Sequence, residues 1–151
     1  MYRRIVVPLD GSEIAQGALK QARDMARLYE ASLFLVRVID TPVAIATPSG
    51  SGGSTPVFAV GVGGQQTNPQ DDRQARDYIE GMTRQLQTEG FRVSGTVVNG
   101  KPADAIVGVL NESDLLVMSS HGRTGLKRFF LGSVAEGVLK NSSNSVFIVR
   151  S

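Results

Sequence analysis

The sequence predicts an α/β fold in which helices cover both faces of one parallel sheet. Along its 151 residues, five short apolar runs of strand length alternate with segments whose apolar residues recur at helical spacing. The composition, 41% hydrophobic and 20% charged, is that of an ordinary globular protein. A β-α-β-α-β-α-β-α-β order builds a parallel sheet through right-handed crossovers. The length fits a single domain over residues 1–151.

The first part of the chain contributes two strands and one helix. The run RIVVPL at residues 4–9 indicates a buried strand, although Pro8 has no N–H to offer a neighbouring strand near its end. Residues 12–28 have helical periodicity, and Ser12 is suited to cap that helix. The run SLFLVRVI at residues 32–39 is the second strand.

A segment of different composition follows, at about residues 41–69, and it is rich in Gly, Ser, Thr and Pro. A structureless stretch of this length is unusual in a compact domain. We interpret it as a flexible insertion. Two roles stay open: surface filler that its neighbours order in part, or a lid or partner-binding segment.

The rest of the chain resumes the alternation. A helical pattern at residues 71–88 ends before Gly90, which is suited to stop a helix. Pro102 stands where a short helix begins, a position that proline favours. The remaining elements are expected at residues 91–98 (strand), 102–110 (helix), 115–118 (strand), 133–140 (helix) and 145–149 (strand).

Composition excludes several classes of function. The 16 Lys and Arg exceed the 14 Asp and Glu by a formal charge of only +2, and outside residues 116–133 no basic stripe suggests a nucleic-acid partner. With no cysteine and one histidine, neither disulfides nor Cys- or His-rich metal sites are expected. The N-terminal apolar run is too short for a signal peptide, and no run approaches the ~20 residues of a membrane span. We therefore expect a cytoplasmic protein without a membrane partner.

The segment 116–133, LVMSSHGRTGLKRFFLGS, is the most basic part of the chain and leads from the fourth strand to the last helix. Its glycines let backbone N–H groups approach an anion, and the N-terminus of a helix favours negative charge. Gly132 and Ser133 stand where that helix is expected to begin. The pattern indicates a phosphate-binding loop; the alternative is a glycine turn before a Ser-capped helix. The basic residues of the segment are His121, Arg123, Lys127 and Arg128.

Asp10 follows the first strand, at the edge of a parallel sheet where ligands usually bind. Its carboxylate is suited to ribose hydroxyls or to a metal ion held by phosphates. The alternative is that Asp10-Gly11-Ser12 forms only a turn and a helix cap. No nucleophile or carboxylate lies near His121 in sequence, which favours a structural role over a catalytic one. Neither GxxxxGK[ST] nor GxGxxG occurs, so kinase and dehydrogenase chemistry lack support.

Together these segments resemble the universal stress protein family over nearly the whole chain. The resemblance rests on RIVVPLDGSEIAQGAL, LFLVRVID, VVNGKPADAIV, SSHGRTGLKRFFLGSVAEGVL and NSSNSVFIV. The ATP-binding branch of that family carries G-x2-G-x9-G-[S/T]. Here Gly122, Gly132 and Ser133 keep this spacing, with nine residues in the long gap, whereas Ser119 replaces the first glycine.

The resemblance implies a Rossmann-like, adenine nucleotide alpha hydrolase-like fold with strand order 3-2-1-4-5. It also implies an adenine nucleotide ligand, ATP, with Mg²⁺ or Mn²⁺. Asp10 would face the ribose or the metal, and Val38 would meet the adenine ring. The residues implied for nucleotide binding are Pro8, Asp10, Val38, Ser119, Gly122, Arg123, Gly132, Ser133 and Val134.

Members of the family commonly form homodimers through the last strand, here Val146, Phe147, Ile148 and Val149. Three functions stay open. The favoured one is a regulatory stress-response protein that holds ATP and hydrolyses it slowly at most, because no base for activating water is evident and no catalytic residue is assigned. The second is a member that binds no ATP and acts through dimerisation and protein partners that the sequence does not identify. The third is an enzyme on a related adenine-binding fold, such as an adenylating enzyme or an electron-transfer flavoprotein relative, for which the chain lacks a separate substrate domain.

Overall fold

The computed structural model describes residues 1–41, 68–120 and 131–150. Within these ranges five strands alternate with four helices, as the sequence predicts. The elements are β1 (Arg4–Pro8), α1 (Glu13–Tyr29), β2 (Ser32–Ile39), α2 (Pro69–Thr88), β3 (Val93–Asn99), α3 (Pro102–Gly108), β4 (Asp114–Ser119), α4 (Ser133–Asn141) and β5 (Ser145–Val149).

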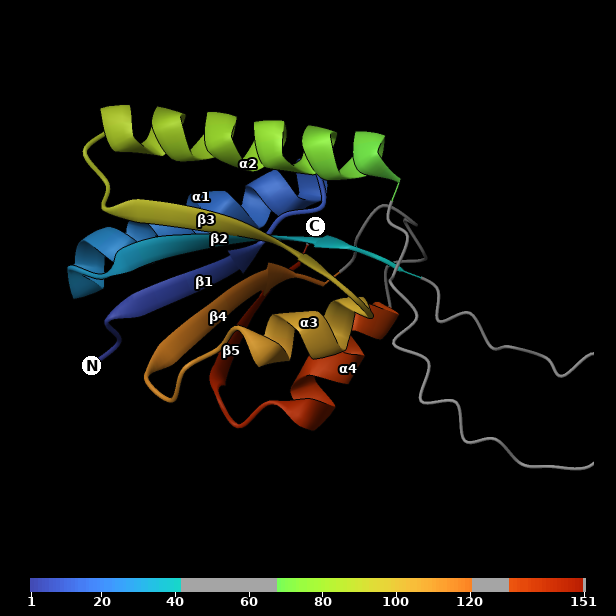
Figure 1. The fold of residues 1–151 in the computed structure, drawn as a ribbon. Coiled ribbons are helices and arrows are strands. Elements are labelled where there is room, and N and C mark those ends of the chain that lie inside the picture. The colour runs from blue at the N-terminus through green and yellow to red at the C-terminus, as the bar shows by residue number, and fades with distance from the viewer. Residues whose placement is uncertain (42–67, 121–130, 151) are drawn as a thin grey trace, which may run out of the picture.

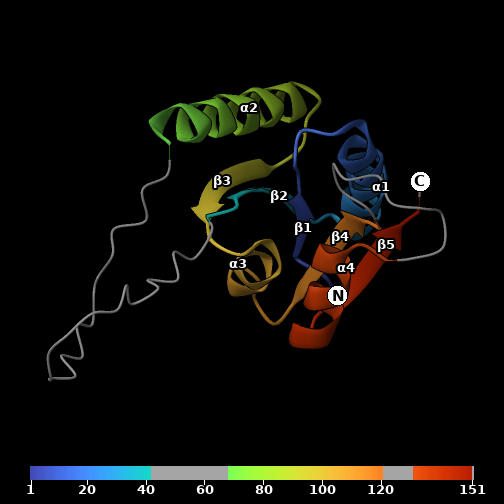
Figure 2. The same cartoon turned by 90° about the vertical axis from the view of Figure 1, so that its right-hand side faces the viewer.

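The strands form one parallel sheet in the order β3-β2-β1-β4-β5, which confirms the expected fold. Helices α1 and α2 cover one face of the sheet, and α3 and α4 cover the other (Figure 1). Figure 2 views the molecule from the side on which the strands end. The chain winds outward from β1 to β3 and then crosses to β4, so the winding reverses between β1 and β4. In folds of this type a ligand crevice forms at that reversal.

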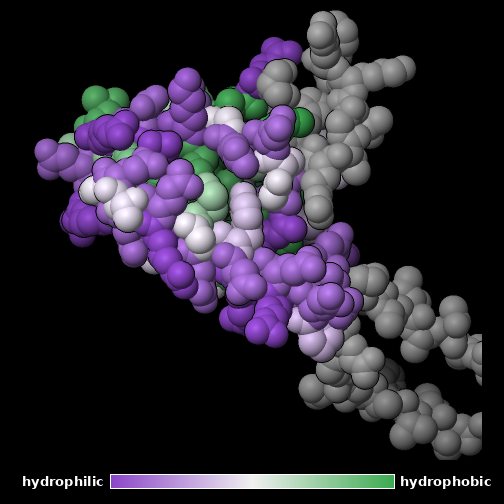
Figure 3. All heavy atoms as spheres, turned by 90° about the horizontal axis from the view of Figure 1, so that it is seen from above, coloured by the Kyte–Doolittle hydropathy of each residue, from purple (hydrophilic) through white to green (hydrophobic). Residues whose placement is uncertain are grey.

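Each face of the sheet has its own hydrophobic core. On the α1/α2 face, alternate strand residues such as Ile5, Leu33 and Val117 pack against alanines and leucines of the helices. On the opposite face, Val6, Val36 and Leu116 pack against α3 and α4. The inner strands β1, β2 and β4 are buried on both sides, which explains why they read as largely apolar runs. The outer surface over α2 is mainly hydrophilic, as expected for a helix that buries only one stripe (Figure 3).

Several element boundaries differ from the sequence prediction by one or two residues. Helix α2 begins at Pro69, because the Asn68 side chain accepts a hydrogen bond from the Gln70 amide at 3.1 Å; the end of the predicted insertion therefore belongs to the helix. Residues 42–67 lie outside the described residues. Gly90 follows α2 with a φ of +90°, the left-handed conformation expected of a helix stop. Strand β3 begins only at Val93, and α3 ends at Gly108.

Gly95 on β3 allows helix α2 to lie directly on the sheet. A Cβ at this position would lie 2.4 Å from Ile79 Cγ2 and 3.1 Å from Thr83 Oγ1. We expect Gly95→Ala to destabilise the fold by about 1–3 kcal/mol, because the helix or its side chains must shift. The measurement is the free energy of unfolding from urea denaturation.

Gly81→Ala is the matched control. Gly81 lies on helix α2, the helix that packs on Gly95, and a Cβ added there would meet no neighbouring atom within 4 Å. The control should gain about 0.5–1 kcal/mol from better helix propensity. If both variants changed the free energy of unfolding alike, close packing of α2 on Gly95 would not explain the effect of Gly95→Ala.

Candidate functional site

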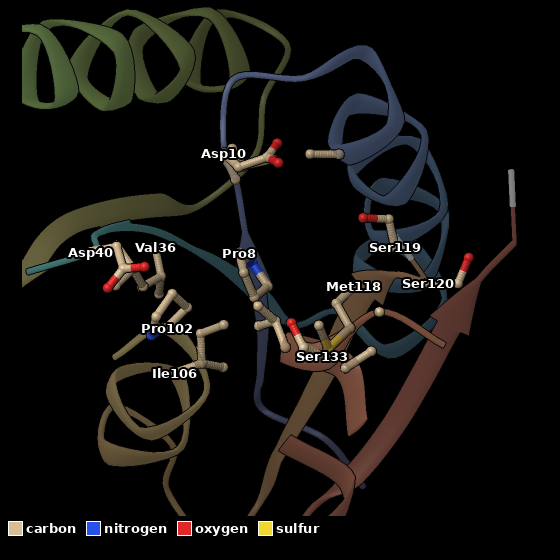
Figure 4. Close-up of a pocket in the computed structure, with 16 residues that line it drawn as sticks. Pro8, Asp10, Val36, Asp40, Pro102, Ile106, Met118, Ser119, Ser120 and Ser133 are labelled. Atoms are coloured by element: carbon tan, nitrogen blue, oxygen red, sulfur yellow. The ribbon is translucent and has the colours of Figure 1, made fainter. Parts of the chain in front are cut away.

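A cavity of about 360 Å³ opens at the carboxyl edge of the sheet (Figure 4). It lies between the ends of β1, β2 and β4 and the first turns of α3 and α4, at the reversal of the winding. Its lining residues are Pro8, Leu9, Asp10, Ala15, Val36, Val38, Asp40, Pro102, Ile106, Met118, Ser119, Ser120, Gly132, Ser133, Val134 and Ala135.

Pro8 helps to open this cavity. The ladder between β1 and β4 ends at the pair Val6↔Leu116, whereas the ladder between β1 and β2 continues to Pro8↔Val36. The Leu9 amide donates to the Val36 carbonyl on β2 at 2.8 Å. Because successive amides point to opposite sides of a strand, the Pro8 nitrogen faces β4. A proline there has no N–H for the ladder, and β1 and β4 separate beyond this point.

The turn after β1 is held by Asp10. Its Oδ1 accepts hydrogen bonds from the Ser12 amide at 2.9 Å and from the Ser12 hydroxyl at 2.5 Å. Ser12 Oγ in turn accepts from the Ala15 amide at 3.2 Å, which confirms Ser12 as the cap of α1. Gly11 takes a φ of +83°, which a side chain would strain. Asp10 therefore forms the predicted turn and helix cap with Ser12. It also lines the cavity.

Helix α4 presents its first turn to the cavity without a side-chain cap. Its N-cap is Gly132, and no side-chain hydrogen bond caps the helix. Ser133 is its first residue, so the alternative of a Ser-capped helix is wrong. Gly132 is fixed by two backbone bonds: its amide donates to the Ser120 carbonyl at 2.8 Å, and its carbonyl accepts from Glu136 at 3.0 Å. The first amides of the helix are thus suited to an anion from outside the protein.

The structure brings seven of the nine predicted nucleotide-binding residues to this one cavity. They are Pro8, Asp10, Val38, Ser119, Gly132, Ser133 and Val134. The other two, Gly122 and Arg123, lie outside the described residues, as do His121, Gly125, Lys127 and Arg128.

Sequence reasoning missed several lining residues, of which Asp40 and Ser120 are polar. Ser120 is only 5% exposed, and its amide donates to the Val149 carbonyl at 2.9 Å. Asp40 directly follows β2, as Asp10 follows β1. The rule that ligands meet the ends of parallel strands, applied to the second strand as well as the first, would have identified it.

The charged residues that line the described part of the cavity are acidic, while Arg37 lines the adjoining cavity that shares them. Asp10 and Asp40 both line the first cavity, and no Lys, Arg or His does so within residues 1–41, 68–120 and 131–150. No group of three His, Cys, Asp or Glu in these ranges is arranged to hold a metal ion. A divalent cation at Asp10 would therefore need further oxygen ligands, such as those of phosphates.

A second and more polar cavity, of about 600 Å³, lies between the end of β2 and helix α2. It shares Asp10, Val38 and Asp40 with the first cavity. Tyr78 contributes a buried hydroxyl that has no hydrogen-bond partner among the described residues. Burial raises the pKa of Tyr78; nearby Arg37 lowers it in part and Asp10 raises it further. The phenol therefore stays protonated at neutral pH.

None of the helices in the described ranges is long and apolar enough to cross a membrane.

Comparison with known proteins gives consistent matches along the chain. The sequence model described as "Universal stress protein family" matches residues 1–150. Universal stress protein MJ0577 of Methanocaldococcus jannaschii is 30% identical over 161 residues, which cover 99% of this chain and 96% of the relative. Its solved structure aligns with a TM-score of 0.72 and 27% identity over 100% of this chain and 97% of that one.

Two solved neighbours contain nucleotides. A universal stress protein in complex with cAMP aligns with a TM-score of 0.66 and 22% identity, covering 99% of this chain and 97% of that chain. A universal stress protein from Archaeoglobus fulgidus in complex with dAMP also aligns with a TM-score of 0.66 and 22% identity, covering 97% of each chain.

Proposed function

The chain belongs to the universal stress protein family, and from this premise we propose that it binds ATP as a regulatory ligand and acts as a stress-response homodimer. The observation that carries the proposal is the single cavity shared by seven residues that the ATP-type resemblance implies. The nucleotide complexes of two structural neighbours support a ligand of this chemical class.

The shape of the cavity suggests how the nucleotide would lie. Apolar side chains of Val36, Val38 and Ile106 line one end, where a flat base would be shielded from water. The uncapped first turn of α4 lies at another wall, where backbone amides and the Ser133 hydroxyl would donate to phosphate oxygens. A Mg²⁺ or Mn²⁺ ion would neutralise the phosphates next to Asp10, with the phosphates completing its oxygen ligands.

The described lining contains little that would speed ATP hydrolysis. A general base must reach an attacking water, and Asp10 already accepts two hydrogen bonds from Ser12 on Oδ1. We therefore propose that ATP is held, with slow hydrolysis at most. Mass spectrometry of the small molecules released when the purified protein is denatured tests the ligand directly. An adenine nucleotide in stoichiometric amount is the expected result.

The second candidate is a family member that binds no ATP and acts through dimerisation and partner proteins. It is favoured by Ser119, which stands where the ATP-type motif has its first glycine. Protein that releases no nucleotide, and that gives no heat when titrated with ATP and magnesium, would support this candidate over the first.

Asp10 provides a test of the ligand's contacts. We expect Asp10→Ala to weaken ATP binding about tenfold, the effect of losing one hydrogen bond to a charged group. The measurement is the Kd from calorimetry with and without magnesium. Ser12→Ala is the matched control, because it removes the hydrogen bond from the Ser12 hydroxyl to Asp10 and keeps the carboxylate and its bond from the Ser12 amide. A Kd that is unchanged in Asp10→Ala under both conditions would contradict the role.

The dimer is proposed through strand β5, which is an edge of the sheet and pairs only with β4 among the described strands. Phe147 is 40% exposed there, while Val146 and Ile148 pack against the core below. An edge of this kind is protected when a second copy covers it through two-fold symmetry.

Phe147→Lys should convert the dimer to a folded monomer, because it places a charge in the apolar interface. Sedimentation velocity measures the change. Leu139→Lys is the control, since Leu139 is 44% exposed on helix α4 and not on the edge strand. If Phe147→Lys stays folded and dimeric, the interface lies elsewhere.

A further inference from the structure

Arg37 on β2 lies next to the turn that carries Asp10 and has not been given a role so far. Side chains alternate along a strand: Leu35 packs on the α1/α2 face of the sheet, and Val36 packs on the opposite face. Arg37 follows on the face of Leu35 and lines the second cavity but not the first. Asp10 lines both cavities. Arg37 therefore approaches the turn from the side away from the proposed nucleotide.

The guanidinium of Arg37 ties the end of β1 to β2. Its Nη1 donates to the Leu9 carbonyl at 3.3 Å, while the Leu9 amide donates to the Val36 carbonyl at 2.8 Å. Both backbone polar groups of Leu9 are thus bound by β2. The same nitrogen of Arg37 lies 3.8 Å from the position that a Cβ on Gly11 would take, so the guanidinium also reaches the turn. Because β1 has already separated from β4 at this point, the turn is held from the side of β2.

The Leu9 carbonyl belongs to the planar peptide unit that leads directly into Asp10. A hydrogen bond to this carbonyl restricts the rotation of that unit, and with it the direction of the Asp10 side chain. The bonds from Ser12 act within the turn, because the Ser12 amide and hydroxyl both donate to Asp10 Oδ1. No described residue donates to Asp10 Oδ2, which is therefore the oxygen available to a ligand.

Arg37 also places a positive charge near Asp10, on the side of the second cavity. The buried hydroxyl of Tyr78 is close to both groups: burial raises the pKa of Tyr78, Arg37 lowers it in part, and Asp10 raises it further. A cation on this side of Asp10 reduces the repulsion between its carboxylate and the phosphates of a bound nucleotide.

We propose that Arg37 is a positioning residue for nucleotide binding: it holds the turn after β1 so that the Asp10 carboxylate faces the nucleotide. This inference rests on the proposed nucleotide-binding function and adds a residue that acts on the ligand only through Asp10. The effects of the two residues on nucleotide affinity are therefore coupled.

The test is a double-mutant cycle on the Kd for ATP with magnesium, measured by calorimetry on the full chain. Arg37→Met removes the guanidinium and should weaken ATP binding about tenfold, the loss expected for Asp10→Ala. Because Arg37 acts through Asp10, the double variant should bind ATP no more weakly than Asp10→Ala alone. Arg37→Lys keeps the charge and a donor group, and it should restore most of the affinity.

Arg92→Met is the matched control. Arg92 Nη2 donates to the Glu30 carbonyl at 2.5 Å, a bond of the same kind at the opposite edge of the sheet, before β3 begins. The Kd for ATP should not change in this variant. Urea denaturation of every variant separates a loss of affinity from a loss of stability. If Arg37→Met does not fold, Arg37→Gln replaces it in the cycle, because it removes the charge and keeps a polar side chain.

The outcomes separate this inference from the function on which it rests. If the Arg37 variant without the charge binds ATP as tightly as the wild type, or if its effect adds in full to that of Asp10→Ala, the positioning role is wrong and ATP binding stands. An equal loss of affinity in Arg92→Met would overturn the role as well. If the wild type binds no ATP, the proposed function fails and this inference fails with it.

Discussion

Gly132→Asp should reduce ATP affinity by about 100-fold or more while leaving the fold at least as stable. Gly132 is the N-cap of α4, with a φ of −66° and a ψ of 155°, a conformation that any residue adopts. Aspartate is among the best N-cap residues, and its carboxylate would accept hydrogen bonds from the amides of Val134 or Ala135. These amides are the proposed phosphate donors. The new side chain would occupy them and add a negative charge where phosphates must lie.

The prediction is checked by calorimetry with ATP and by urea denaturation on the same protein. Gly132→Asn is the matched control, because it caps the helix in the same way without the charge. It should lose less affinity than the aspartate variant. If Gly132→Asp keeps wild-type affinity, the phosphates do not lie at the start of α4.

Asp114→Ala should have the largest effect on stability, about 3 kcal/mol. Asp114 is 3% exposed at the start of β4 and accepts from Arg4 Nε at 3.1 Å, from Arg4 Nη2 at 2.5 Å and from the Asn111 amide at 2.7 Å. Arg4 also donates to the Val109 carbonyl at 2.8 Å and lies 4.5 Å from the centre of the Phe34 ring. Removing the acid leaves this half-buried guanidinium without its counterion. Losing one partner of a buried pair costs about 3–5 kcal/mol, and the partial exposure of Arg4 favours the lower end.

Glu80→Ala provides the comparison for this effect. It breaks the exposed Glu80–Arg84 pair on helix α2, in which the side chains are 62% and 77% exposed. Such pairs contribute at most about 0.5 kcal/mol. The free energies of unfolding from urea denaturation should therefore differ by several-fold between the two variants. Equal losses would mean that the Arg4–Asp114 pair does not join β1 to β4 energetically.

The sequence was sufficient for the fold because the inner strands β1, β2 and β4 are buried on both faces. Five consecutive apolar residues follow Arg4 in RIVVPL, without the polar positions of an amphipathic helix, and helix signals stand between the strands. Ser12 and Gly90 also act locally as their residue types predict. Such signals depend on a few neighbouring residues, so a single sequence contains them.

Features that depend on distant partners were not predictable. Asp114 belongs to a buried strand only because Arg4, more than a hundred residues away in sequence, neutralises it. Helix α1 ends at Glu30, which takes a left-handed φ of 52° although no glycine marks the stop. Asp40 becomes a site residue only when the sheet brings the ends of β1 and β2 together. In each case tertiary contacts outweigh local preference.

The candidate site was predicted mainly from the spacing of the G-x2-G-x9-G-[S/T] motif. The residue types of the loop alone indicated only a phosphate-binding segment. Glycines and basic residues indicated a phosphate loop, but Pro8, Val38 and Ser119 entered only through the family resemblance. The geometry now gives a physical reason for Pro8, which cannot extend the ladder toward β4. It also gives one for Gly132, whose lack of a side chain leaves the first amides of α4 uncapped.

The most direct test of the central claim is a crystal structure of the chain with saturating ATP and magnesium. We predict that phosphate oxygens lie within hydrogen-bond distance of the Ser133 and Val134 amides, with the base against Val38. A nucleotide bound anywhere else, or a cavity that holds none at saturating concentration, would contradict the claim.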